Sequence, residues 1–125
     1  MLCLEHIGIC AKDTVSLKDW YVKHFNLETV YDNKKEKPTF ILKFSDGGLL
    51  EIYSSESENK MCSNKCQGIR HLAFGSDNID AEYQRLKKDV CIEKELSANA
   101  KGIKTFFFRD LEGNLIHFVQ RPTAL

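Results

Sequence analysis

Apolar and polar residues along this chain follow two different periods. Several short stretches alternate apolar and polar positions, which is the pattern of half-buried β-strands. Two longer stretches instead repeat apolar residues every three or four positions, which indicates amphipathic helices. In the first of these, Asp13 can cap a helix that places Leu17, Trp20, Tyr21 and Phe25 on one face.

The second helical stretch begins near Asp77 and carries Ile79, Tyr83 and Leu86 on one face. The alternating stretches predict eight strands, four in each half of the chain. Those of the first half lie at about 3–10, 28–33, 38–45 and 48–54, and those of the second half at about 69–75, 91–96, 103–109 and 114–121.

The order of these elements occurs twice, and two sequence motifs occur twice with it. The motif LEHIGI at 4–9 is echoed by IRHLAF at 69–74, and FSDGGLLEIY at 44–53 is echoed by FRDLEGNLIHF at 108–118. Two echoes in the same order indicate an internal duplication rather than chance. We therefore predict an α+β fold built from two βαβββ modules.

The length of 125 residues gives room for one domain with a real core. We expect module one at about 1–54 and module two at about 68–125. Between them lies 55–67, a stretch rich in Ser, Glu, Asn and Lys that we expect to be a linker. Turns at 46–48 and 112–114, each containing glycine, join the last two strands of each module.

Four potential metal ligands lie in the predicted strands: His6, Glu51, His71 and His117. Because side chains alternate along a strand, each lies opposite large apolar neighbours such as Ile52. Taken alone, each fits a solvated strand residue better than a ligand. The duplication puts all four at equivalent positions, 45 residues apart in the first pair and 46 in the second. Three imidazoles and a carboxylate predict a site for Zn²⁺, Ni²⁺, Co²⁺, Mn²⁺ or Fe²⁺.

Other histidine and aromatic positions have an ordinary structural interpretation. His24 lies in the first helix beside charged residues, where we expect a solvated imidazole. The run of phenylalanines at 106–108 and the alternating Phe40, Leu42 and Phe44 fit strand core, with an apolar pocket wall as the alternative.

Composition and charge exclude some classes of binding partner. The chain is 42% hydrophobic and 29% charged, and its eighteen basic residues balance eighteen acidic ones. This balance gives no attraction to nucleic acid or to an anionic membrane surface. The apolar runs are too short for a transmembrane helix. The first ten residues lack a basic leader and fit a strand, so we expect a cytoplasmic protein.

The chain has five cysteines, an odd number that cannot all pair in disulfides within one chain, and we expect reduced thiols. Cys62 and Cys66 are the only close pair, spaced C-x3-C in a polar segment. No second pair or nearby histidine completes a tetrahedral zinc site there, so we interpret them as two dispensable loop thiols.

The chain resembles the vicinal-oxygen-chelate superfamily, that is, the glyoxalase, bleomycin-resistance and dioxygenase proteins. The resemblance covers essentially the whole chain. It rests on His6, on the helix SLKDWYVKHFNL at 16–27, on GLLE at 48–51, on GIRHLAF at 68–74 and on DLEGNLIH at 110–117. These motifs identify the superfamily well and the reaction poorly, because the fold hosts isomerases, lyases, transferases, oxygenases and binding proteins.

Within that superfamily the chain is most similar to glyoxalase I. The resemblance implies that each module curls into half of a barrel, that the halves enclose a metal, and that His6, Glu51 and His71 are ligands. The fourth glyoxalase I ligand is a glutamate that also helps move the substrate proton, and this chain has His117 there. Cys10 stands where glyoxalase I has an arginine that helps hold glutathione. Both departures weaken the expectation of a glutathione substrate.

The leading hypothesis is therefore a metal-dependent lyase or isomerase that acts through an enediolate on a small oxygenated substrate, with thiol adducts among the candidates. Glu51 is the expected base, and His117 is the second candidate. The alternatives are a fosfomycin-type thiol transferase or Fe²⁺ oxygenase, and a non-catalytic binding or resistance protein. Small members of the superfamily commonly pair across chains, so we also expect a homodimer.

Overall fold

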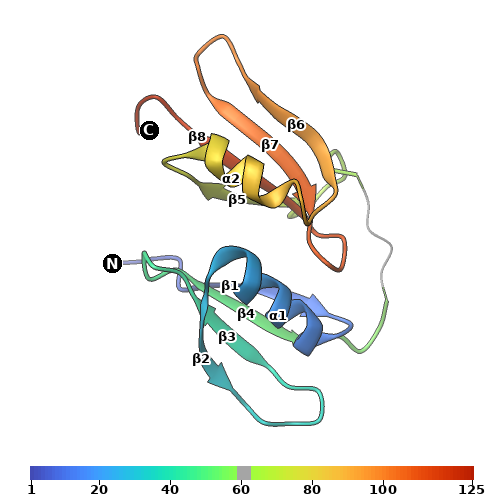
Figure 1. The fold of residues 1–125 in the computed structure, drawn as a ribbon. Helices are drawn as coiled ribbons and strands as arrows, with labels where there is room; N and C mark the ends of the chain where they lie inside the picture. Colours follow the sequence, from blue (N-terminus) through green and yellow to red (C-terminus); the bar gives the residue numbers. More distant parts are fainter. Residues whose placement is uncertain (59–62) are drawn as a thin grey trace. The chain divides into compact units, whose positions relative to one another are not determined.

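The computed structural model describes residues 1–58 and 63–125 and contains the βαβββ order twice (Figure 1). The chain divides into two compact units, Met1–Lys60 and Met61–Leu125. Two four-stranded mixed sheets, each with one helix, confirm the predicted two-module α+β fold. The first unit contains β1 (His6–Ala11), α1 (Thr14–Phe25), β2 (Glu28–Asp32), β3 (Phe40–Lys43) and β4 (Leu49–Ser54); the second contains β5 (His71–Gly75), α2 (Ile79–Leu86), β6 (Ile92–Ala98), β7 (Lys104–Arg109) and β8 (Leu115–Gln120).

Each sheet has the same strand order. In the first unit the order is β1-β4-β3-β2, and in the second it is β5-β8-β7-β6. The first strand runs parallel to the last (β1 with β4, β5 with β8), and the remaining neighbours are antiparallel. In both units the helix connects the first strand to the outer hairpin and lies over one face of its own sheet (Figure 1). The opposite face of each sheet is not covered by the helix of its own unit.

The core of the first unit lies between α1 and the sheet. Asp13 caps the helix as expected, because its carboxylate accepts from the Ser16 backbone N–H at 3.0 Å. Ile52 is fully buried and Ile9 is 8% exposed, whereas Ile7, which alternation places on the same face, is 38% exposed near the start of its strand. Ile7 therefore contributes less to the core than its position in the pattern suggested. The buried apolar side chains of this unit are Ile9, Ala11, Leu17, Tyr21, Leu27, Phe40, Leu42, Leu50 and Ile52.

The expectation of a solvated His24 is wrong. Its side chain is only 6% exposed, because it lies one helical turn beyond Trp20 and packs against that indole with ring centroids 4.8 Å apart. The charged sequence neighbours of His24 point elsewhere around the helix, and its own position falls on the buried stripe shared with Leu17 and Tyr21.

The core of the second unit is built largely by phenylalanines. Phe106 and Phe108 are fully buried under α2, with their rings stacked at 5.6 Å. Phe107 lies between them in sequence and is therefore on the other face of β7. The strand-core interpretation of 106–108 thus holds for two of the three rings. Helix α2 begins at Ile79, close to the expected start near Asp77, and Asn78 caps it by accepting from the Ala81 backbone N–H at 3.2 Å.

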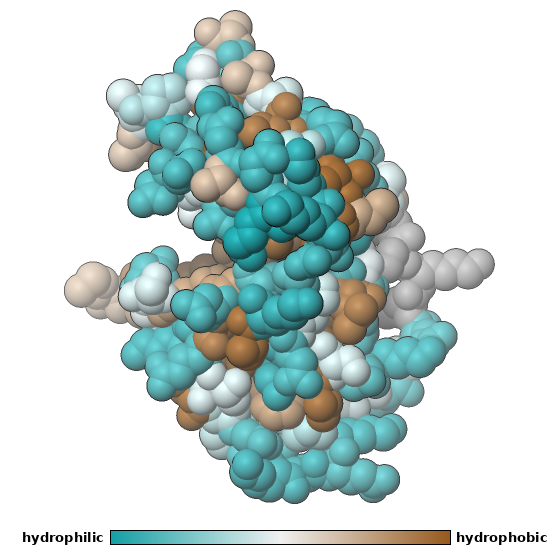
Figure 2. Space-filling model, viewed as in Figure 1, coloured by the Kyte–Doolittle hydropathy of each residue, from teal (hydrophilic) through white to brown (hydrophobic). Residues whose placement is uncertain are grey.

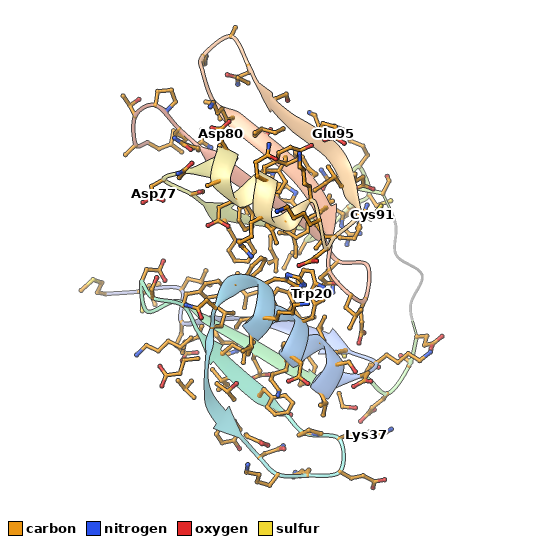
Figure 3. All side chains as sticks on the ribbon, viewed as in Figure 1. Trp20, Lys37, Asp77, Asp80, Cys91 and Glu95 are labelled. Atoms are coloured by element: carbon orange, nitrogen blue, oxygen red, sulfur yellow. The ribbon has the colours of Figure 1, made fainter. Side chains whose placement is uncertain are left out.

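Polar contacts connect α2 to β7 and β6. Lys104 on β7 forms an ion pair with Asp80 on α2 at 2.6 Å, and the Tyr83 hydroxyl donates to Glu95 on β6 (Asp80 and Glu95 are labelled in Figure 3). On the side of the molecule shown in Figure 2, hydrophilic residues cover much of the surface of both units. Among the described residues, no helix is long and apolar enough to cross a membrane.

Candidate metal-binding faces of the two units

The sheet face opposite α1 carries the first predicted ligand pair. His6 is the first residue of β1, and Glu51 is in β4, where it pairs in register with Gly8. Paired residues of neighbouring strands share a face, so Glu51 lies on the same side as Gly8 and His6. The His6 Nε2 and Glu51 Oε2 atoms are 3.9 Å apart, and both side chains are partly exposed. An imidazole nitrogen and a carboxylate oxygen are both ligands of divalent ions, so this pair would contribute two donors if a metal were bound.

Gly8 makes room for an aromatic side chain beside this pair. A Cβ atom at Gly8 would meet the Tyr53 ring carbon Cε1 at 3.2 Å, closer than an ordinary contact. Tyr53 is 38% exposed, so its ring covers the backbone at Gly8 and still presents surface to solvent. The first unit therefore offers an imidazole, a carboxylate and a phenol on one face.

The other ring nitrogen of His6 is already engaged. Its Nδ1 is hydrogen-bonded to the carboxylate of Glu5, the preceding residue. This hydrogen bond is the main reason that the pKa of His6 is raised, with the charges of Glu5 and Glu51 acting in the same direction and desolvation opposing them. Because a carboxylate only accepts, Nδ1 carries the proton and Nε2 is left to face Glu51.

The second unit presents two imidazoles at the equivalent positions. His71 is the first residue of β5, and His117 in β8 pairs in register with Ala73. The two rings are stacked, with centroids 4.9 Å apart and an interplanar angle of 27°. His71 Nδ1 lies 3.0 Å from the side-chain carbonyl oxygen of Asn64. As in the first unit, an acceptor occupies Nδ1 and leaves Nε2 available.

His117 is partly buried in the second unit. Its Nδ1 atom is buried and has no hydrogen-bond partner in the part of the chain that the structure describes. The Phe107 ring meets the imidazole edge-on at 4.6 Å. Burial, followed by the charges of His71 and Arg121, lowers the pKa of His117 below its ordinary value. His117 is therefore neutral at neutral pH, as a metal ligand must be.

The structure brings the predicted residues together in two pairs, His6 with Glu51 and His71 with His117. Within neither unit do three or more His, Cys, Asp or Glu side chains of the described residues gather into a metal-binding group. The residues of each pair fit a divalent ion in their chemistry, since imidazole nitrogens and carboxylate oxygens are both ligands of such ions. The buried and unpartnered Nδ1 of His117 fits as well, because such an atom in a native fold calls for a partner.

Three side chains around these pairs were not assigned to the ligands from the sequence. Glu5 could have been noticed as an acceptor adjacent to His6. Phe107 could have been separated from its neighbours by strand alternation, which puts it on the His117 face. Asn64 carried no signal, because it lies in a segment whose composition indicated only a linker.

The cysteine pair is only partly described. Cys62 lies outside the described residues, so its role as a loop thiol stays a prediction. Cys66 is exposed, with its Sγ 3.8 Å from the Ser63 Oγ. Cys3, Cys10 and Cys91 are exposed free thiols, and Cys10 follows His6 and Gly8 on the same face of β1.

Comparison with known proteins identifies the fold family. The model of the Glyoxalase/Bleomycin resistance protein/Dioxygenase superfamily matches residues 4–118. A glyoxalase family protein from Enterococcus faecalis is 25% identical with a TM-score of 0.79, and the match covers 93% of this chain and 95% of that one. No curated protein matches the chain.

Two further solved structures share the fold at lower identity. A lactoylglutathione lyase from Agrobacterium tumefaciens is 17% identical with a TM-score of 0.72, covering 94% of this chain and 92% of its own. The fosfomycin resistance protein FosX from Listeria monocytogenes is 20% identical with a TM-score of 0.76, covering 100% and 96%. Members of the matched superfamily commonly bind divalent metals. Because the family model matches residues 4–118 and the duplicated βαβββ fold is in place, the chain belongs to the glyoxalase/bleomycin resistance protein/dioxygenase superfamily.

Proposed function

We propose that this protein is a metal-dependent lyase or isomerase of the glyoxalase type. His6, Glu51, His71 and His117 are its metal ligands, and its substrate is a small molecule with adjacent oxygen atoms. When bound, a divalent ion supplies Lewis-acid stabilisation of negative charge on substrate oxygens.

The observation that carries the proposal is the state of His117. A buried ring nitrogen without a hydrogen-bond partner is costly in a fold unless a ligand engages it, and the lowered pKa keeps the ring neutral. His117 also occupies the position in the second unit that Glu51 occupies in the first. Two equivalent pairs, each with an imidazole on the first strand, favour metal binding over four unrelated polar residues.

Glu51 is the proposed proton acceptor. Its carboxylate is partly exposed, so it can reach a substrate proton, and a carboxylate can move between a metal and a proton. His117 is the second candidate, held in place by Phe107 and His71. A metal-bound imidazole is the weaker base of the two, so the departure from a glutamate at this position predicts modest proton-transfer activity.

The aromatic side chains on the same faces support a small organic substrate. Tyr53 in the first unit and Phe107 in the second stand beside the ligand pairs. Lys94 lies over the Phe107 ring at 5.5 Å, which puts a cation next to the second pair. This setting suits a substrate with an apolar body and a negatively charged group.

A direct assay tests the proposal. The protein is loaded separately with Zn²⁺, Ni²⁺, Co²⁺, Mn²⁺ or Fe²⁺ and assayed on a panel of α-oxoaldehyde–thiol adducts, with fosfomycin plus thiol as a comparison. We expect metal-dependent isomerisation of at least one adduct, abolished in Glu51→Gln. Metal-dependent opening of fosfomycin without isomerase activity would assign a transferase, and tight small-molecule binding without turnover would assign a binding protein.

A further inference from the structure

We infer that Asn64 is a positioning residue, which holds the His71 imidazole in the tautomer whose Nε2 is free to bind a metal. The inference rests on the proposed function, in which His71 is a ligand. Its first consequence is nevertheless a property of the protein without metal.

The contact itself fixes the position of the proton. The Asn64 Oδ1 and His71 Nδ1 atoms are 3.0 Å apart. A side-chain carbonyl oxygen can only accept, so the hydrogen of this bond belongs to Nδ1. In the neutral ring Nε2 then carries the lone pair, which is the form of histidine that coordinates a metal.

The two units obtain this acceptor in different ways. In the first unit Glu5 immediately precedes His6 and accepts from its Nδ1. The residue at the equivalent position in the second unit is Arg70, whose guanidinium has only donors. An acceptor for His71 must therefore come from elsewhere in the chain, and Asn64, seven residues earlier, supplies it.

A local turn brings Asn64 to that place. The Cys66 backbone N–H donates to the Ser63 carbonyl at 3.0 Å, which closes a turn with Asn64 at its second position. The Ser63 hydroxyl also accepts from the Lys65 N–H at 3.3 Å. These bonds order the backbone on both sides of Asn64, so that its amide can reach β5.

The consequence for metal binding follows from tautomer chemistry. Without an acceptor at Nδ1 the proton can move to Nε2, where it competes with the ion for the lone pair. Acceptors that orient metal-bound histidines are typically worth about 10–100-fold in metal affinity. We expect an effect of that size for Asn64.

Three variants test the inference. Asn64→Ala removes the acceptor, Asn64→Asp keeps one, and Gln67→Ala changes an exposed residue close by in the same segment. Long-range ¹H–¹⁵N NMR of the metal-free proteins, all at the same alkaline pH, reads the His71 tautomer from its two ring nitrogens. Zn²⁺ affinity is then measured by competition with a chromophoric chelator, and far-UV circular dichroism checks the fold.

Wild type, Asn64→Asp and Gln67→Ala should all show the Nδ1–H tautomer and similar Zn²⁺ affinity. Asn64→Ala should shift His71 toward the Nε2–H form and bind Zn²⁺ about 10–100-fold more weakly. An unchanged tautomer in Asn64→Ala overturns the inference, and Zn²⁺ binding by the wild type in that case leaves the proposed function standing. If the tautomer shifts in Asn64→Ala but the wild type does not bind Zn²⁺, the Asn64 contact is supported and the proposed function is contradicted.

Discussion

His6 and His117 experience opposite electrostatic surroundings within one small protein. The carboxylate of Glu5 holds a proton on His6 and raises its pKa. His117 is enclosed by Phe107 and His71, and burial lowers its pKa. The pKa values of the two histidines are thus shifted in opposite directions, and this difference is measurable without metal or substrate.

Acidification of the metal-free protein should protonate these two rings in a fixed order. As the pH falls from about 8 to about 5, His6 with its raised pKa takes up its proton first, and His117 with its lowered pKa follows. NMR titration of the imidazole Cε1 protons checks the order. His117 titrating before His6 would show that the enclosure of His117 described here is absent in solution.

A single substitution should change the balance between metal binding and proton transfer. His117→Glu restores two histidines and two glutamates as ligands, keeps the metal and adds a carboxylate that can act as a base. We expect isomerase activity on a glutathione hemithioacetal to appear or rise, within the range of about 10²–10⁴-fold typical of general-base catalysis. Cys10 keeps the gain toward the lower end. His117→Gln, which keeps a polar side chain without a base, is the matched control and should not gain.

At the scale of a single element, strand β7 serves two faces at once. Phe106 and Phe108 fill the core under α2, and Phe107 contacts His117 on the other face. Sequence alternation predicts this division, because side chains along a strand point to opposite sides. The same strand therefore links the stability of the fold to the position of a proposed ligand.

Alanine substitutions in β7 should separate these two roles. Phe108→Ala empties a fully buried site and should lower the free energy of unfolding by about 3–5 kcal/mol. Phe107→Ala removes an edge-to-face contact worth about 1 kcal/mol and should cost less stability but more metal affinity. Urea denaturation and Zn²⁺ titration of both variants check the division. Equal losses of stability would contradict it.

Most helices and strands could be predicted because the pattern of apolar and polar residues that indicates each of them occurs twice in the chain. Caps and turns add local chemistry: Asp13 caps α1, and Gly47 and Gly113 adopt positive φ values of 95° and 90° in turns placed correctly from the sequence. His24 was misjudged, since charged sequence neighbours say little about which side of a helix a residue faces. Asn64 could not be predicted, because its contact with His71 depends on how an irregular turn folds back.

At the scale of the whole molecule, each sheet ends in strands that have one neighbour within their own sheet. These are β1 and β2 in the first unit and β5 and β6 in the second. Edge strands offer backbone groups for further pairing, and proteins usually cover them. Members of this superfamily often form dimers, which is consistent with that need.

We therefore predict a homodimer. Light scattering coupled to size exclusion should give about twice the chain mass of 14.4 kDa at micromolar concentrations. A mass of one chain across the whole micromolar range would contradict the prediction. That result would leave the assignment of the four proposed ligands unchanged.

Metal content is the measurement that tests the central claim most directly. Elemental analysis after equilibrium dialysis against Zn²⁺ should find about one ion per chain in the wild type. Alanine at His6, Glu51, His71 or His117 should each release most of that metal. His24→Gln and Glu28→Ala should retain it, because His24 is buried in the core of the first unit and Glu28 lies on the outer strand β2.

Circular dichroism should show that the four alanine variants remain folded, because the cores are built by side chains on the opposite faces of the same sheets. The account predicts loss of metal with retention of fold in all four. Metal content that is indifferent to His117, or that falls equally in the two control variants, would contradict it.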